Sequence, residues 1–233
     1  MYENSEVSYC YSTGVLIGAN SVGGIAALPS EGAKITSCVA WNWKITGPAA
    51  RSGRISGVLS QGENGHQADP ISIFPTLCHG VPQLAMLFCK VRALSLTPSY
   101  FPVETEGDFA NGDGTQNNPY VIANAIHIQN MSKALIEKQT TYFVLSADID
   151  MQGIKWAPLN DANGNHKWID FDGRNHVIKN LTCESGTYRS FFGVLCGECR
   201  NVGFVDANIT SPNTGIGIIA GYVGLALPAL LAI

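Results

Sequence analysis

The chain has 233 residues, of which only 14% are charged, and its formal net charge is −4. This charge content is well below the usual quarter, and a soluble helical bundle needs many Glu and Lys residues on its outer faces. With 25 glycines, the composition therefore favours an all-β chain with frequent turns. Because Lys and Arg do not cluster, nucleic-acid binding has no electrostatic footprint in the sequence.

Residues 7–59 contain two repeats, each a set of short apolar–polar alternations separated by Gly and Asn. Cys10 and Cys38 occupy matching positions in the two repeats, 28 residues apart. We interpret them as small core residues stacked on one another, and a disulfide between them stays an open alternative. Since one such repeat cannot bury its own apolar face, the pattern predicts stacked repeats that share one core.

Residues 60–106 interrupt this pattern with a polar loop at 62–67 and an apolar stretch at 71–96. Apolar residues at a helical spacing predict a short helix over 83–96. Lys90, Arg92 and two prolines make the apolar run too short for a membrane span. We therefore expect three parts: 1–59 as the end of one β-solenoid unit, 60–106 as an irregular linker, insertion or disturbed reading frame, and 107–233 as the start of a second β-solenoid unit.

The second unit opens with a turn-rich stretch, 111–118, whose Asn, Asp and Gly residues could suggest calcium. The spacing of an EF-hand and its closing Glu are missing, so an ordinary turn is the preferred interpretation. Asn124 then predicts the start of a short capping helix, 125–137, that buries Ile128, Met131 and Leu135 on one face. Strands are expected at 142–145 and 147–151.

Residues 171–181 predict a strand, a tight turn at Asp172-Gly173 and a second strand. Glycine-rich apolar stretches follow at 190–195 and 217–223, with Gly193 and Gly221 28 residues apart. A period of about 20–50 residues is typical of repeat architectures. The residues expected to point inward are Phe171, Ile178, Leu181, Phe192, Val194, Ile209 and Ile219. Residues 216–233 are uncharged and could suggest a membrane helix, but Pro228 interrupts them and the repeat accounts for 217–223.

Residues 107–224 resemble a unit of bacterial surface proteins with GLUG-type repeats. The matching features are Asn-Pro-Tyr at 118–120, the helix at 125–137, Ala-Asp-Ile-Asp at 147–150, Trp-x-Pro at 156–158, Phe-Asp-Gly-x-x-His-x-Ile-x-Asn-Leu at 171–181, and the glycine motifs at 192–195 and 217–221. Residues 8–58 resemble later repeats of the same kind, whereas Arg174-Asn175 departs from the usual Asn-Gly. The resemblance implies a right-handed parallel β-helix with repeats of about 25–30 residues.

This family is associated with adhesin-like surface proteins and with repeat regions beside secreted metallopeptidases. The five histidines form no HExxH motif, so no peptidase activity is carried over. We therefore expect a non-enzymatic bacterial protein, cell-surface or secreted, that serves in adhesion or as a spacer or binding scaffold. Its expected partners are a host or matrix protein or a glycan, and neighbouring repeats of a longer chain. No catalytic, cofactor or metal residue is assigned, and the chain shows no signal peptide.

The alternative function is that of a carbohydrate-active β-helix enzyme, a polysaccharide lyase or glycosidase, which needs carboxylates along one face. The candidate residues are Asp148, Asp150, Asp170 and Asp172, with Arg174 or Lys179. An Asp before Gly also forms turns, and alternating Asp residues also mark a solvated strand face. Cys196 and Cys199 have CxxC spacing, but they lack the second pair of a zinc site and the βαβ context of a redox motif.

Overall fold

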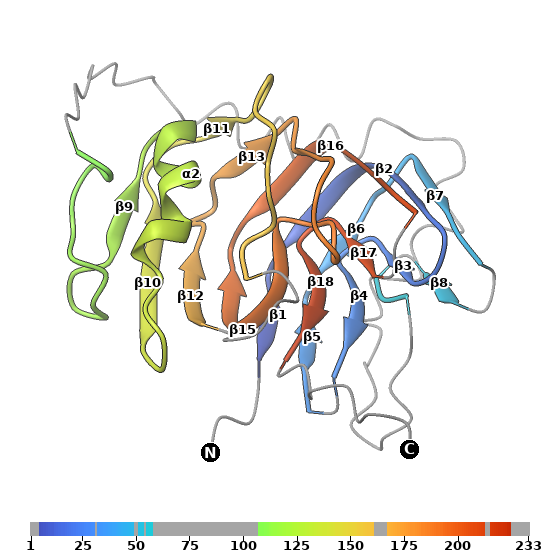
Figure 1. Ribbon diagram of the computed structural model, residues 1–233, viewed down its shortest axis with the longest axis horizontal. Helices are drawn as coiled ribbons and strands as arrows, with labels where there is room; N and C mark the ends of the chain where they lie inside the picture. Colours follow the sequence, from blue (N-terminus) through green and yellow to red (C-terminus); the bar gives the residue numbers. More distant parts are fainter. Residues whose placement is uncertain are drawn as a thin grey trace.

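The computed structural model describes residues 5–30, 32–48, 51–53, 55–57, 107–160, 167–212 and 215–224 (Figure 1). The helix expected over 83–96, the whole expected linker 60–106 and the apolar end 225–233 lie outside these residues. The described part is mostly β, with parallel sheets and one short α-helix.

The strands form three sheets in which every strand-to-strand pairing is parallel, as the repeat pattern predicts. The first sheet contains β9 (Tyr120–Ile122), β10 (Thr140–Leu145), β12 (Trp168–Asp172), β15 (Phe192–Arg200), β18 (Ala220–Val223), β4 (Ala26–Pro29), β1 (Glu6–Ser8) and β5 (Lys34–Thr36). The second contains β11 (Ile149–Asp150), β13 (Val177–Lys179), β14 (Thr182–Cys183), β16 (Gly203–Ser211), β2 (Tyr11–Gly18), β6 (Val39–Ala40) and β7 (Lys44–Thr46). The third contains β17 (Ile216–Gly217), β3 (Val22–Gly23) and β8 (Ser52–Gly53).

From β15 through β18, and again from β1 through β4, the chain passes through the first, second and third sheets in turn and returns to the first; we call one such pass a coil. Between β10 and β15 the chain alternates between the first and second sheets. The register between neighbouring coils follows the repeat of the sequence. Phe192 pairs with Ala220 and Val194 with Tyr222, so Gly193 lies opposite Gly221 as predicted. A Cβ atom on Gly221 would overlap Cβ of Tyr188 and lie 3.0 Å from the carbonyl oxygen of Gly193, so this position leaves no room for a side chain.

The core lies between the sheets and is lined by alternate residues of each strand. All seven residues predicted to point inward are fully buried. Phe191 lies at the centre of an aromatic cluster: its ring centroid is 5.1 Å from that of Trp156, 5.1 Å from that of Phe204 and 4.8 Å from that of Phe192. Stacked and edge-to-face rings of this kind pack closely and add to the stabilisation from apolar burial.

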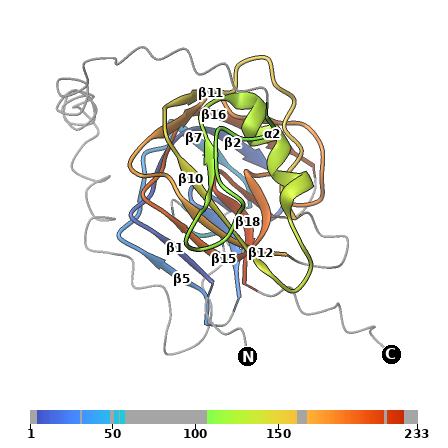
Figure 2. The ribbon, with the colours of Figure 1, turned by 90° about the vertical axis from the view of Figure 1, so that its left-hand side faces the viewer.

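Helix α2 (Ala125–Ala134) lies at the same end of the stacked coils as β9 and β10, the end that faces the viewer in Figure 2. The side chain of Asn124 accepts a hydrogen bond from the backbone N–H of His127 (3.0 Å), which is the predicted N-cap. Ile128, Met131 and Leu135 are buried, as predicted, although the helix ends three residues earlier than expected. The helix thus closes the apolar end of the core.

The segments 5–57 and 107–224, expected in two separate units, share all three sheets. Strands β1, β2, β3 and β4 pair with β15, β16, β17 and β18. The first segment of the chain therefore stacks beyond the last strands of the second, and blue strands lie beside red ones in Figure 1. The stack runs from β9 and α2 to β5 and β8.

Candidate functional site

Charged side chains gather on the outer face of the first sheet, where β12 and β15 lie side by side. Strand alternation turns Ile169 and Phe171 into the core and Asp170 and Asp172 outward. The register places Asp170 opposite Glu198 and Asp172 opposite Arg200. The two strands, which lie one repeat apart in the sequence, thus place three carboxylates and one guanidinium on the same face.

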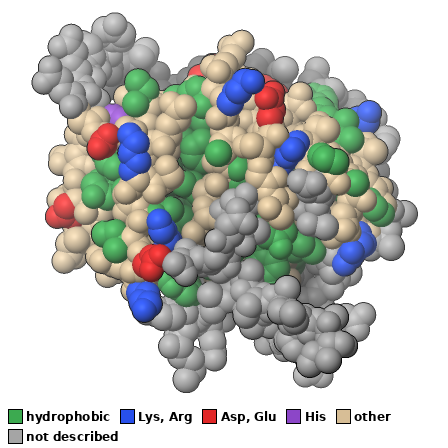
Figure 3. Space-filling view, in the orientation of Figure 1, with side chains coloured by type: hydrophobic (Ala, Val, Ile, Leu, Met, Phe, Trp, Pro, Cys, Tyr) green, Lys and Arg blue, Asp and Glu red, His purple; other side chains and the backbone are tan. Residues whose placement is uncertain are grey.

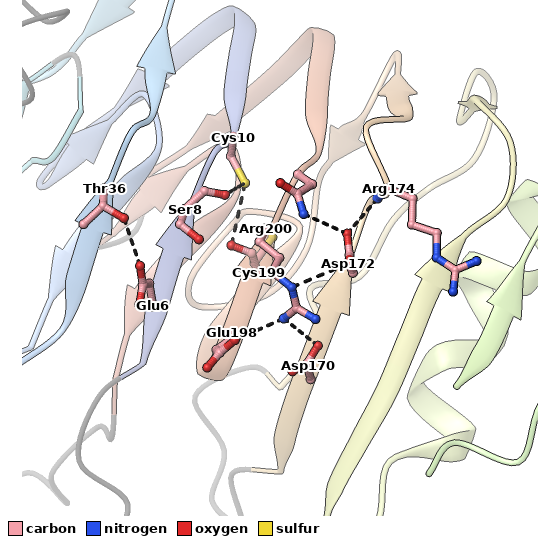
Figure 4. A network of polar contacts seen from close by, with 11 residues as sticks. Glu6, Ser8, Cys10, Thr36, Asp170, Asp172, Arg174, Glu198, Cys199 and Arg200 are labelled. Carbon is pink, nitrogen blue, oxygen red and sulfur yellow. Dashed lines mark hydrogen bonds and ion pairs between the residues drawn. The ribbon is translucent and has the colours of Figure 1, made fainter. Parts of the chain in front are cut away.

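Arg200 is the centre of this group, which we call the Arg200 cluster: Asp170, Asp172, Glu198 and Arg200 (Figure 4). Arg200 Nη1 lies 2.8 Å from Asp170 Oδ1 and 3.1 Å from Glu198 Oε2, and Nε lies 3.6 Å from Asp172 Oδ2. Asn201 Nδ2 donates a further hydrogen bond to Asp172 Oδ1 (3.1 Å). The guanidinium therefore contacts all three carboxylates.

Burial raises the pKa of Asp170, because its carboxylate is largely removed from water. The charge and hydrogen bond of Arg200 lower this pKa, while the nearby charges of Glu198 and Asp172 raise it further. The net effect is a raised pKa, and the charge and hydrogen bond of Arg200 limit how far the pKa of Asp170 rises.

The polar rows continue onto β1 and β5, which belong to the other segment of the chain. Glu6 lies opposite Glu198 on one side and opposite Lys34 on the other. Thr36 Oγ1 donates a hydrogen bond to Glu6 Oε1 (2.9 Å). The outer face therefore carries a row of charges across four strands, and both segments contribute to it.

The structure does not bring all the predicted acidic candidates together. Asp148 and Asp150 lie beside or in β11 of the second sheet, whereas Asp170 and Asp172 lie on β12 of the first. Asp148 accepts a hydrogen bond from the backbone N–H of Val177 (3.0 Å). The side-chain amide of Asn180 donates a hydrogen bond to Asp150 (2.8 Å) and lowers its pKa.

The two basic candidates also lie apart from the cluster. The side chain of Arg174 points away from it in Figure 4, although the backbone N–H of Arg174 donates a hydrogen bond to Asp172 (2.8 Å). Lys179 pairs with Asp150 in the register of β13 with β11 and contributes to lowering its pKa. Neither side chain contacts Arg200 as the three carboxylates of the cluster do.

Glu198 and Arg200 are the residues that reasoning from the sequence missed. The 28-residue repeat carried the signal, because it aligns Asp170 with Glu198 and Asp172 with Arg200. Their grouping needed the register of the strands, which sets which side chains are neighbours. Since Asp170 and Glu198 both contact Nη1 of Arg200, the two contacting oxygens are at most about 6 Å apart.

Cys10, Cys38, Cys196 and Cys199 are buried free thiols, and Cys183 is buried as well. Cys10 and Cys38 lie in neighbouring coils, as predicted, because Tyr11 pairs with Val39. Burial raises the pKa of the Cys196 thiol to about 12, so it stays protonated near neutral pH. Among the described residues, no group of three His, Cys, Asp or Glu side chains could hold a metal ion.

Two aromatic side chains stand out on the surface. Tyr9 is 66% exposed and Trp43 is 73% exposed. Both backbones are fixed by neighbouring coils, since Tyr9 N donates to Thr36 O (3.2 Å) and Trp43 N donates to Gly14 O (2.9 Å). On the face shown in Figure 3, acidic and basic side chains are scattered among neutral ones. In the described part of the chain, no helix has the length and apolar character of a membrane span.

No family model matches the chain. A protein of Evansella cellulosilytica, provisionally named a Gly-rich membrane protein, is 33% identical over 112 residues; the match covers 44% of this chain and 13% of that protein. A crystal structure from Bacteroides ovatus, provisionally described as an immunoglobulin A1 protease, is 53% identical with a TM-score of 0.49. It covers 52% of this chain and 36% of that chain. The chain therefore spans about an eighth of the length of the first protein and about a third of the second.

The Arg200 cluster predicts a pH-dependent stability. Replacement of Arg200 by Met should lower the free energy of unfolding at pH 7 by about 1–2 kcal/mol, because it leaves partly buried carboxylates without their cation. The pKa of Asp170 in the folded variant should then lie further above its ordinary value of 3.8. Between pH 3.8 and this raised pKa, the folded variant binds more protons than the unfolded variant. The loss of unfolding free energy relative to the parent should therefore shrink as the pH falls toward 3.8.

Urea unfolding of both proteins between pH 7 and pH 4 measures this effect. Lys155→Met is the matched control, because Lys155 pairs with Glu184 where both side chains are mostly exposed. This control should change the free energy of unfolding by less than about 0.5 kcal/mol at every pH. A deficit of the Arg200 variant that is independent of pH would contradict the assigned role of Asp170.

Proposed function

We propose that this chain is part of a bacterial cell-surface or secreted protein, in which a right-handed parallel β-helix with GLUG-type repeats serves as a non-enzymatic binding scaffold. The observation that carries the proposal is the Arg200 cluster. The carboxylates most suggestive of chemistry are each in contact with one arginine, and that arginine lies between Asp170 and Glu198. A general acid and base instead need a reacting group between them.

The name of the Evansella relative, a Gly-rich membrane protein, supports a location at the cell surface. The three parallel sheets and the repeat register support the β-helix, and the resemblance to GLUG-type repeats supports an adhesin-like role. The partner class proposed is a host or matrix protein or a glycan. A stack of coils suits this task because it presents a long, rigid surface.

Trp43 and Tyr9 are the side chains that the proposal places in contact with the partner. Exposed aromatic residues on a rigid backbone commonly dominate the binding energy of an interface. Trp43→Ala should therefore weaken binding at least tenfold in an array of host matrix proteins and glycans, while the melting temperature stays unchanged. Ile126→Ala is the control, because Ile126 is also exposed (64%) but lies on α2 at the far end. Equal binding by both variants and the parent would contradict the placement.

The alternative, a carbohydrate-active enzyme, is favoured by the short separation of the Asp170 and Glu198 oxygens, which is near the spacing that glycosidases use. A screen of the purified protein against acidic and neutral polysaccharides separates the two functions. The scaffold proposal expects no cleavage by the parent. Cleavage that disappears in Asp170→Asn, Asp172→Ala or Glu198→Gln, with folding intact, would overturn it.

A further inference from the structure

Strand β15 is one continuous strand, yet its neighbour on one side comes from two distant parts of the chain. Phe192 to Leu195 pair with Ala220 to Val223 of β18. Glu198 to Arg200 pair with Glu6 to Ser8 of β1. The first half of β15 thus pairs with the last described strand of the chain, and its second half pairs with the first described strand.

The junction between these two neighbours falls at consecutive residues of β15. Cys196 Sγ donates to the carbonyl oxygen of Gly224 (3.3 Å), and the backbone N–H of Gly197 donates to Ser5 Oγ (3.1 Å). Gly224 and Ser5 therefore occupy successive positions of one coil. The coil therefore continues from Gly224 to Ser5 in space, although no covalent bond joins these two residues.

The coil continues from there in the order of a regular repeat. Strand β2 pairs with β16 over the register from Tyr11–Gly203 to Gly18–Ser211, and β3 pairs with β17. The next coil repeats this, since β4 pairs with β18 and β5 pairs with β1. Every sheet of segment 5–57 thus extends the corresponding sheet of segment 107–224.

Side chains and close backbone contacts at this interface fix the register. Thr13 Oγ1 accepts a hydrogen bond from the backbone N–H of Asp206 (2.9 Å). Gly14 has no Cβ where Ala207 comes close, and Gly203 leaves room for the ring of Tyr11. A shift of one residue would lose these contacts and turn buried side chains outward. The edge of β15, β16, β17 and β18 therefore selects one sequence in one register.

We infer that segment 5–57 is the continuation of the repeat after Gly224, and that this edge is an acceptor site that binds it by strand addition within the same chain. The chain is a circularly permuted arrangement of stacked coils. The order of the coils is set by pairing and side-chain fit, because each unpaired backbone N–H and C=O at the edge gains a partner when the segment docks. Residues 58–106 supply the covalent link.

Disulfide trapping in the full chain tests this inference. The variant carries Glu6→Cys and Glu198→Cys, with Cys78 and Cys89 replaced by Ser. Because Glu6 and Glu198 pair on adjacent strands, their Cα atoms lie within the range that a disulfide spans. Oxidation with glutathione disulfide at low protein concentration should link the two positions inside one molecule. The control pair, Glu137→Cys with Glu198→Cys, should stay reduced, because Glu137 lies in the turn before β10 and β12 lies between β10 and β15.

A reordered chain provides the second measurement. It places residues 107–224 first and joins Gly224 directly to Ser5, followed by the remainder through 106. We expect cooperative thermal unfolding at a temperature no lower than that of the parent, because the same strand pairs form. Failure of this chain to fold, absence of the Glu6–Glu198 cross-link, or a cross-link found only between two molecules would each overturn the inference.

Discussion

Replacement of Phe191 by Ala should lower the free energy of unfolding by about 3–5 kcal/mol, because it removes the central ring of the core. Phe191 is fully buried, and its ring contacts the rings of Trp156, Phe171, Phe192 and Phe204. These residues belong to different coils and sheets, so they cannot all move to fill the space. A loss of this size is a large fraction of the roughly 5–15 kcal/mol that stabilises a typical folded protein.

Urea unfolding followed by circular dichroism and tryptophan fluorescence measures this loss. Ile126→Ala is the control, because it removes a large apolar side chain that is 64% exposed. The control should change the free energy of unfolding by less than about 0.5 kcal/mol. If the two variants were destabilised to the same small extent, the aromatic cluster would not be the centre of the core.

Gly14→Ala should destabilise the protein by at least about 3 kcal/mol, because it combines backbone strain with a steric clash. Gly14 has a φ of +139°, a conformation that residues with a side chain rarely adopt. A Cβ atom there would also overlap the carbonyl oxygen of Ala207, where β16 has an irregular register with β2. The two strands would have to separate at the junction of segments 5–57 and 107–224.

Gly153→Ala is the matched control for this variant. Gly153 also has a positive φ (+80°), but no atom lies within 4 Å of a Cβ built there. Gly153→Ala should therefore lower the free energy of unfolding only by the cost of the backbone conformation, about 1 kcal/mol. Thermal unfolding of both variants separates strain from the clash, and equal losses would mean that β2 and β16 do not approach as closely as the structure shows.

The periodicity of the sequence by itself determined the local elements and the inward-facing residues. Alternation of apolar residues marks the core face of a strand wherever one face is buried, which is why Phe171, Ile178 and Phe192 were predicted correctly. The N-cap at Asn124 was also readable, because a side-chain acceptor before an apolar helical pattern is a local signal. The 28-residue spacing of Gly193 and Gly221 likewise predicted their alignment.

Only the tertiary structure decided how the coils are ordered and which charges meet. A repeat pattern predicts that coils stack, but all coils have similar edges. The order of the segments along the chain therefore does not reveal that β18 and β1 pair with successive parts of β15. The same holds for Arg200, whose contacts with Asp170 and Glu198 depend on register and on side-chain direction across two strands. Local signals act over a few residues, whereas these neighbours are set by pairing between segments far apart in the chain.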